Sequence, residues 1–112
     1  MLSLDLARKL KAKGLKHKPE DGDVYWVSEV EEMMVIAGAF EPEDEDVWVP
    51  RLDQLLAEVE RQGYRWKLVF DGDSYYFRFT GVWVPRLECC KYNAPEDAVA
   101  DGLLCVIGVW RS

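Results

Sequence analysis

The side chains that most often perform chemistry in proteins are sparse in this sequence of 112 residues. Of the three cysteines, Cys89 and Cys90 are adjacent and Cys105 is distant, and His17 is the only histidine. An odd count with a neighbouring pair is not a disulfide framework, and there is no C-x-x-C motif to begin a zinc site. We therefore predict no metal site and no cofactor, and we expect the thiols to be buried or merely tolerated.

The sequence patterns of catalysis and of nucleotide binding are also missing. Neither GxxxxGK[ST] nor GxGxxG occurs, and no serine has the context of a nucleophile elbow. His17 lies in a lysine-rich stretch, where no nucleophile–base pair can be assembled around it. A thiol at Cys89 or Cys90, activated by Arg86 or Lys91, is an alternative. The sequence predicts a protein that is not an enzyme and has no catalytic residue to name.

The most acidic stretch is E-P-E-D-E-D, residues 41–46. The D-x-[DN]-x-[DN]-G spacing of a calcium loop is absent, and carboxylate catalysis needs two acids in differing environments. A solvated loop before a helix is the simplest interpretation. Mimicry of a nucleic-acid backbone is an alternative, because a row of carboxylates presents regular negative charge.

The hexapeptide V-W-V-P-R-L occurs twice, at residues 47–52 and 82–87, with unrelated flanks. The chain is therefore not a solenoid, which needs several similar units. Each copy is predicted to be a strand ended by proline, with its tryptophan in a pocket, and the alternative is a docking segment that a partner reads. The candidate partner-binding residues are Glu43, Asp44, Glu45, Asp46, Trp48 and Trp83.

Charge is distributed unevenly along the chain, whose net charge is −7. Residues 1–18 carry six basic side chains and one acid, whereas residues 19–60 carry fourteen acids and one base. A basic arm beside an acidic middle can complement itself within one molecule or between two copies, so a homodimer is among the expectations. The negative sign argues against direct binding of nucleic acid, which relies on neutralising phosphates.

Length predicts a single domain, residues 1–112. Hydrophobic residues make up 49% of the chain, so it is not a disordered one. No apolar run approaches the roughly 20 residues that span a bilayer, and the first residues lack the order of a secretory signal. We expect a cytoplasmic protein with no membrane interaction.

Residues 47–70 indicate the structure most firmly. Pro50 suits a first helical turn, an apolar stripe at helical spacing follows, and Gly63 can end the helix. Alternation from Trp66 to Phe70 then predicts a strand. Two further patterns predict hairpins: the apolar runs at residues 24–27 and 33–37, and the D-G turn at residues 71–72.

Helices are also predicted at the two ends of the chain. Ser3 is expected to cap the first helix, which Gly14 ends, and Asn93 with Glu96 has the pattern of a capping box for the last. A terminal strand is the alternative for that last segment, and residues 82–92 are expected to add a strand to the second hairpin. The predicted fold is α+β, an antiparallel sheet of three to five strands packed against two or three helices, with the basic N-terminal helix at an edge.

Parts of the chain resemble a type of small protein encoded in phages, prophages and their bacterial hosts. W-V-P-R-L-D-Q-L-L and the later Y-R-W-K-L are similar to a W-x-P-x-L-x-Q-L-L helix entry and a Y-x-W-x-L strand in these proteins. A-P-E-D-A-V-A-D-G-L-L resembles their closing T-P-E-E-A-x-A-x-A-L-L helix, with Ala94 where threonine is usual. The resemblance implies a phage-related or bacterial cytoplasmic origin and no activity, because such proteins are generally uncharacterised.

The preferred interpretation is a non-catalytic, phage-related accessory or protein-interaction protein. It would bind another, unknown protein through the acidic loop and exposed tryptophans. One alternative is an acidic inhibitor of a host protein that mimics nucleic acid, which requires carboxylates spread over one face. The other is a small enzyme with no recognisable site, which requires a concave pocket with convergent polar groups.

Overall fold

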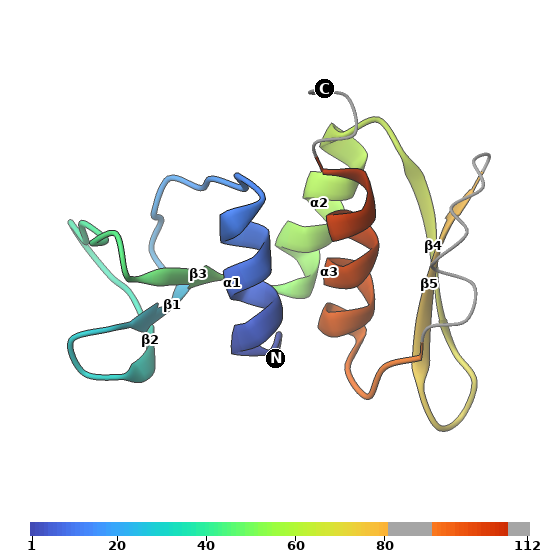
Figure 1. Ribbon diagram of the computed structural model, residues 1–112, viewed down its shortest axis with the longest axis horizontal. Coiled ribbons are helices and arrows are strands. Elements are labelled where there is room, and N and C mark those ends of the chain that lie inside the picture. The colour runs from blue at the N-terminus through green and yellow to red at the C-terminus, as the bar shows by residue number, and fades with distance from the viewer. Residues whose placement is uncertain (81–90, 108–112) are drawn as a thin grey trace.

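The computed structural model describes residues 1–80 and 91–107. Three helices and five strands follow one another as α1 (Leu4–Ala12), β1 (Val24–Val27), β2 (Glu32–Val35), β3 (Val47–Val49), α2 (Leu52–Arg61), β4 (Arg65–Phe70), β5 (Tyr75–Thr80) and α3 (Pro95–Val106). The helices lie between a three-stranded sheet at one end of the molecule and a two-stranded sheet at the other (Figure 1). The predicted α+β class is confirmed, with the antiparallel strands divided between two sheets because α2 carries the chain away from β3 before β4 begins.

The three-stranded sheet has the order β2-β1-β3, with both pairs antiparallel. The predicted hairpin of β1 and β2 is confirmed, and the first copy of the hexapeptide forms β3, as expected. Pro50 does not lie in the first helical turn, which is a correction. It follows β3 and precedes Arg51, the N-cap of α2, because the chain stays extended through the cap. The Arg51 backbone N–H then donates to Oε1 of Gln54 at 2.9 Å.

Strands β4 and β5 form the second predicted hairpin, joined by a turn at Asp71. One carboxylate oxygen of Asp71 accepts the backbone N–H groups of Asp73 and Ser74, at 3.0 and 2.9 Å. Tyr75 of β5 exchanges two backbone hydrogen bonds with Tyr92. The strand expected over residues 82–92 otherwise lies outside the described residues, together with the second hexapeptide.

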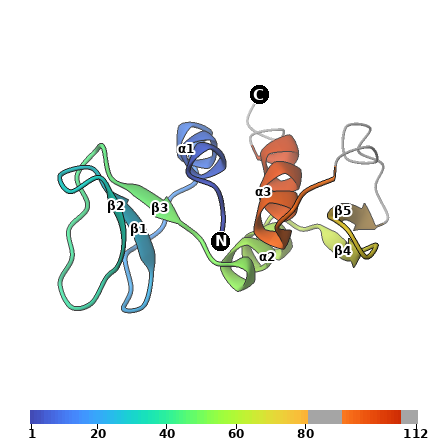
Figure 2. The same ribbon diagram turned by 90° about the horizontal axis from the view of Figure 1, so that it is seen from below.

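The core lies where the helix layer meets both sheets. Helix α1 packs against β3, an edge strand of the three-stranded sheet, and against α3, so it lies between that sheet and the other helices (Figures 1 and 2). Helix α2 packs against α3 and β4, and α3 also packs against β5. The buried side chains include Ala7, Leu10, Val47, Val49, Leu55, Val59, Phe77, Phe79, Val99 and Leu103. No helix in residues 1–80 and 91–107 combines the length and the apolar character needed to cross a membrane.

The last segment is a helix rather than the alternative strand, as far as residue 107. Its N-cap is Ala94 and not Asn93, so the predicted capping box is wrong. The acids in the first turn of α3 interact with the N-terminal segment instead. The backbone N–H of Ser3 donates to Oδ1 of Asp97 at 2.8 Å. Ser3 itself caps α1 as predicted, accepting the N–H of Leu6. The N-terminal segment is thus joined to the first turn of α3.

Candidate functional site

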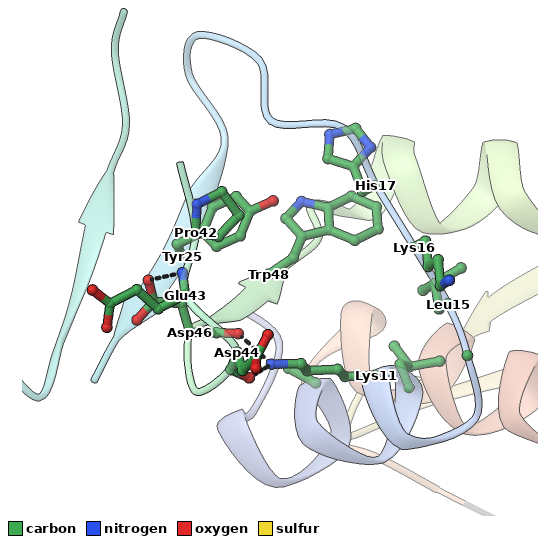
Figure 3. Close-up of a pocket in the computed structure, with 13 residues that line it drawn as sticks. Lys11, Leu15, Lys16, His17, Tyr25, Pro42, Glu43, Asp44, Asp46 and Trp48 are labelled. Carbon is green, nitrogen blue, oxygen red and sulfur yellow. Dashed lines mark hydrogen bonds between the residues drawn. The ribbon is translucent and has the colours of Figure 1, made fainter. Parts of the chain in front are cut away.

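A pocket of about 480 Å³ lies on one face of the three-stranded sheet, beside α1 (Figure 3). One wall comes from α1 and the segment after it, including Leu10 and Lys11. Another comes from the acidic stretch, and Tyr25 and Trp48 contribute aromatic surface from the sheet. Small-molecule sites are concave and combine apolar and aromatic walls with a few polar groups, and this pocket contains both kinds of wall.

Tyr25 and Trp48 reach the pocket because they are cross-strand partners on β1 and β3. Successive side chains of a strand alternate between faces, so their neighbours Val24 and Val49 face the opposite side, where Val49 joins the core. Burial, and then the charges of Asp23 and Asp46, raise the pKa of Tyr25 to about 12. The tyrosine hydroxyl is therefore protonated at neutral pH and can donate a hydrogen bond.

His17 stacks on Trp48 with ring centroids 3.9 Å apart and planes at 10°. Its Nε2 lies 2.7 Å from Oδ2 of Asp23, a side chain that is 1% exposed. This link fixes the imidazole against the indole. The sequence did not indicate this cluster, because His17 and Trp48 are 31 positions apart and no local pattern connects them.

Asp23 is held by groups from two parts of the chain, the segment before β1 and the start of α2. It accepts the backbone N–H of Glu20 at 2.8 Å and the side-chain amide of Gln54 at 2.7 Å, and Arg51 lies 3.7 Å away. Burial alone would raise the pKa of Asp23, but the hydrogen bonds from Glu20, Gln54 and His17 outweigh it and lower the pKa. The group is a carboxylate at neutral pH, and it joins the segment before β1 to α2.

Trp48 has one unusual polar atom. Its indole Nε1 is buried, and it has no hydrogen-bond partner among the described residues. A buried N–H without a partner costs about 1–3 kcal/mol and calls for an explanation. The stacking on His17 fixes the orientation of the indole although this donor is left unsatisfied.

The acidic stretch divides into exposed and buried members. Glu43, Asp44 and Glu45 are exposed, whereas Asp46 is 6% exposed. Asp46 accepts the N–H and the hydroxyl of Ser28, both at 3.0 Å, and the N–H of Glu43 at 2.9 Å. Of the four predicted partner-binding acids, Asp46 is therefore committed to the fold.

The basic arm contributes one cation to this acidic stretch within the same molecule. Nζ of Lys11 donates to the backbone carbonyl of Asp46 at 2.7 Å and also to that of Asp44. Burial would raise the pKa of Asp46, but the hydrogen bonds from Glu43 and Ser28 and the charge of Lys11 lower it. Trp48, the next candidate, is half-buried in the pocket, and Trp83 lies outside the described residues.

A second candidate surface is the outer edge of β2. Among the described residues, β2 pairs with β1 alone. Three large apolar side chains of this hairpin are exposed: Val30 at 50%, Met34 at 45% and Val35 at 71%. The sequence reasoning missed this surface, because apolar residues in a short strand pattern are usually read as buried.

No three His, Cys, Asp or Glu side chains gather as a metal site would require in residues 1–80 and 91–107. Cys105 is half-buried on α3, and Cys89 and Cys90 lie outside the described residues. A comparison with protein-family models finds no match, and comparisons with curated proteins and with solved structures find none either.

Proposed function

We propose that this is a non-catalytic protein-interaction protein, which binds a basic, extended segment of a partner protein along the open edge of β2. The observation that carries the proposal is the outer edge of β2, which no strand in the described part of the chain covers and which has exposed apolar side chains. A strand of another chain can add to such an edge through backbone hydrogen bonds, while its side chains provide specificity.

The backbone groups at the edge follow from the sheet register. The N–H of Ile36 donates to the carbonyl of Asp23 at 2.9 Å, so Ile36 faces β1. Antiparallel strands alternate between residues that face the partner strand and residues that face away. Met33 and Val35 therefore direct their N–H and C=O groups outward, where an added strand would meet them.

The side chains support an interaction rather than a protected edge. Edge strands usually carry lysine, proline or a bulge that discourages pairing. Strand β2 instead exposes Met34 and Val35, and its only charged residue is Glu32. An added strand would bury this apolar surface and gain about 25 cal/mol per Å² of it.

Charge complementarity indicates that the partner is basic. The hydrogen bonds of Asp46 to Ser28 join the turn after β1 to the end of the acidic loop. Two groups of exposed carboxylates thus meet near one end of β2: Glu29, Glu31 and Glu32 from the hairpin, and Glu43, Asp44 and Glu45 from the loop. A second copy of the chain would bring like charges together, so a basic partner is favoured over a homodimer at this edge.

The non-catalytic part of the proposal has separate support. His17 and Asp23 resemble the base and orienting acid of a triad, but a triad also needs a nucleophile. Among the described residues that line the pocket there is no serine, threonine or cysteine. The phage-related origin and the cytoplasmic location stay predictions, and the origin rests on the resemblance.

The test uses a labelled peptide of alternating lysine and valine, with binding followed by fluorescence anisotropy. The control peptides replace lysine by glutamate, or every second valine by proline. Val35→Pro should weaken binding about fivefold to tenfold, because it removes one N–H that points away from β1 toward the added strand. The pairing of β2 with β1 should stay intact, because the N–H of residue 35 takes no part in it. Glu32→Gln should weaken binding of the basic peptide because it removes one of the exposed carboxylates, and Glu60→Gln, at an exposed carboxylate on α2, is its matched control.

Three results would overturn the proposal: no binding of the basic peptide, equal binding of the glutamate peptide, or full binding by a folded Val35→Pro variant. Binding that depends on the acids but not on Val35 would favour the alternative, an acidic mimic of nucleic acid. That outcome should also show loss of binding as salt is raised, because screening weakens contacts between exposed charges.

A further inference from the structure

We propose that the pocket beside α1 is a binding site for a neutral, planar heteroaromatic molecule of the nucleobase class, stacked on Trp48. This site is distinct from the edge of β2. It lies on the sheet face that carries Tyr25 and Trp48, and its walls come from α1 and the acidic loop.

The indole offers one face to such a ring. His17 covers the other face at 3.9 Å, with the planes nearly parallel. Figure 3 shows His17 on one side of Trp48 and Lys11 on the other, across the pocket. A planar ligand between the indole and α1 would extend the stack to three rings. Stacking on an aromatic side chain is how proteins hold nucleobases without reading their sequence.

The stack is fixed before any ligand enters. Asp23, 1% exposed and bound by Glu20 and Gln54, holds His17 through the 2.7 Å contact, and His17 holds the indole. The unsatisfied Nε1 of Trp48 is consistent with a ring held in place for another purpose. A ring that is already oriented loses little freedom when a ligand binds, which favours affinity.

The charges around the pocket favour a neutral ligand over an ion. Two cations, Lys11 and Lys16, and three acids, Glu43, Asp44 and Asp46, line it. Asp46 and Lys11 already interact with the fold and with each other, which leaves Lys16 opposite the exposed acids. An anion would meet more like charges than opposite ones, and a cation would meet Lys16, whereas a dipolar ring with both donors and acceptors can use both kinds of group.

Size is also consistent with this class. The pocket holds about 480 Å³, within the range of about 300–1,000 Å³ typical of small-molecule sites. Leu10, Leu15 and Pro42 supply apolar surface for the ring edges. The protonated hydroxyl of Tyr25 is a further donor in the lining.

The test is titration of the full chain with adenine, benzoate and benzylammonium, followed by calorimetry and by the indole N–H resonances in NMR. The Trp48 resonance is assigned as the one missing from Trp48→Phe. We expect adenine to bind, to shift that resonance, and to bind more tightly than either charged ring. Trp48→Leu should weaken adenine binding tenfold or more, and Trp48→Phe, which keeps a smaller ring, should weaken it less.

Trp66→Leu is the matched control, because Trp66 is a half-buried tryptophan on β4 that does not line the pocket. It should leave adenine binding unchanged, as should Val35→Pro at the β2 edge. The proposal is wrong if adenine leaves the Trp48 resonance in place. It is also wrong if a folded Trp48→Leu or Trp48→Phe variant binds adenine as the parent does, or if a charged ring binds better.

Discussion

Gly102 of α3 and Phe77 of β5 are so close that a methyl group does not fit between them. A Cβ built on Gly102 would lie 2.4 Å from Cδ2 and 2.7 Å from Cε2 of the buried phenyl ring. Glycine inside a helix usually costs about 1 kcal/mol relative to alanine. Here its missing side chain allows α3 to sit directly on the two-stranded sheet.

Gly102→Ala is therefore expected to destabilise the protein by about 1–3 kcal/mol, despite the better helix propensity of alanine. Urea unfolding measures the free energy. Adding Phe77→Leu should make the cost of the alanine smaller than it is alone, because the ring that it meets is gone. A stabilised Gly102→Ala variant would show that the helix is further from β5 than the structure places it.

Asp46→Asn is expected to lower the free energy of unfolding by about 1.5–3 kcal/mol. The amide group that replaces one carboxylate oxygen must face either the Ser28 donors or the N–H of Glu43, and it cannot accept from them. Asp44→Asn is the control, two residues away in the same loop and exposed, and should change stability by less than about 0.5 kcal/mol. Equal effects of the two changes would mean that Asp46 is not the buried anchor.

Acid should destabilise the protein through Asp23 and Asp46. Both have a folded pKa below the ordinary value of 3.8, because hydrogen bonds outweigh the effect of burial. Their stabilisation is fully present above about pH 4 and is lost as the pH falls through the lowered folded values. The free energy of unfolding, measured from pH 6 to pH 2, should therefore decrease as the pH drops below about 4. The slope of the unfolding free energy against pH should be smaller in Asp46→Asn. An unchanged slope would contradict the assignment of part of this pH dependence to Asp46.

Asp97→Ala is expected to cost about 1 kcal/mol, because the backbone N–H of Ser3 loses its acceptor. Asp97→Asn keeps an oxygen and should cost less. Asp53→Ala is the matched control in the first turn of α2, where the exposed carboxylate interacts with the helix dipole and with Arg51. Thermal unfolding compares the three. If Asp53→Ala lowers the stability as much as Asp97→Ala does, the effect of Asp97 comes from the helix dipole alone and not from its hydrogen bond to Ser3.

Local chemistry in the sequence predicted most of the elements. The apolar stripe of α2, the turn at Asp71 and the cap at Ser3 each depend on residues a few positions apart, so their spacing is sufficient to predict them. The two errors at helix starts, Pro50 and Asn93, concern boundaries of one or two residues. These boundaries depend on how the preceding strand or bridge ends, which spacing does not fix.

The candidate sites depended on the tertiary structure. The sequence determined that His17, Asp23, Trp48 and the acidic stretch exist, and that Trp48 lies on a strand. Only the fold decided that His17 stacks on Trp48, that Asp23 holds His17, and that Asp46 is buried while Asp44 is exposed. The physical reason is that these contacts join separate elements. The packing of α1 and the loop against one sheet face selects them, and neither periodicity nor turn chemistry carries that information.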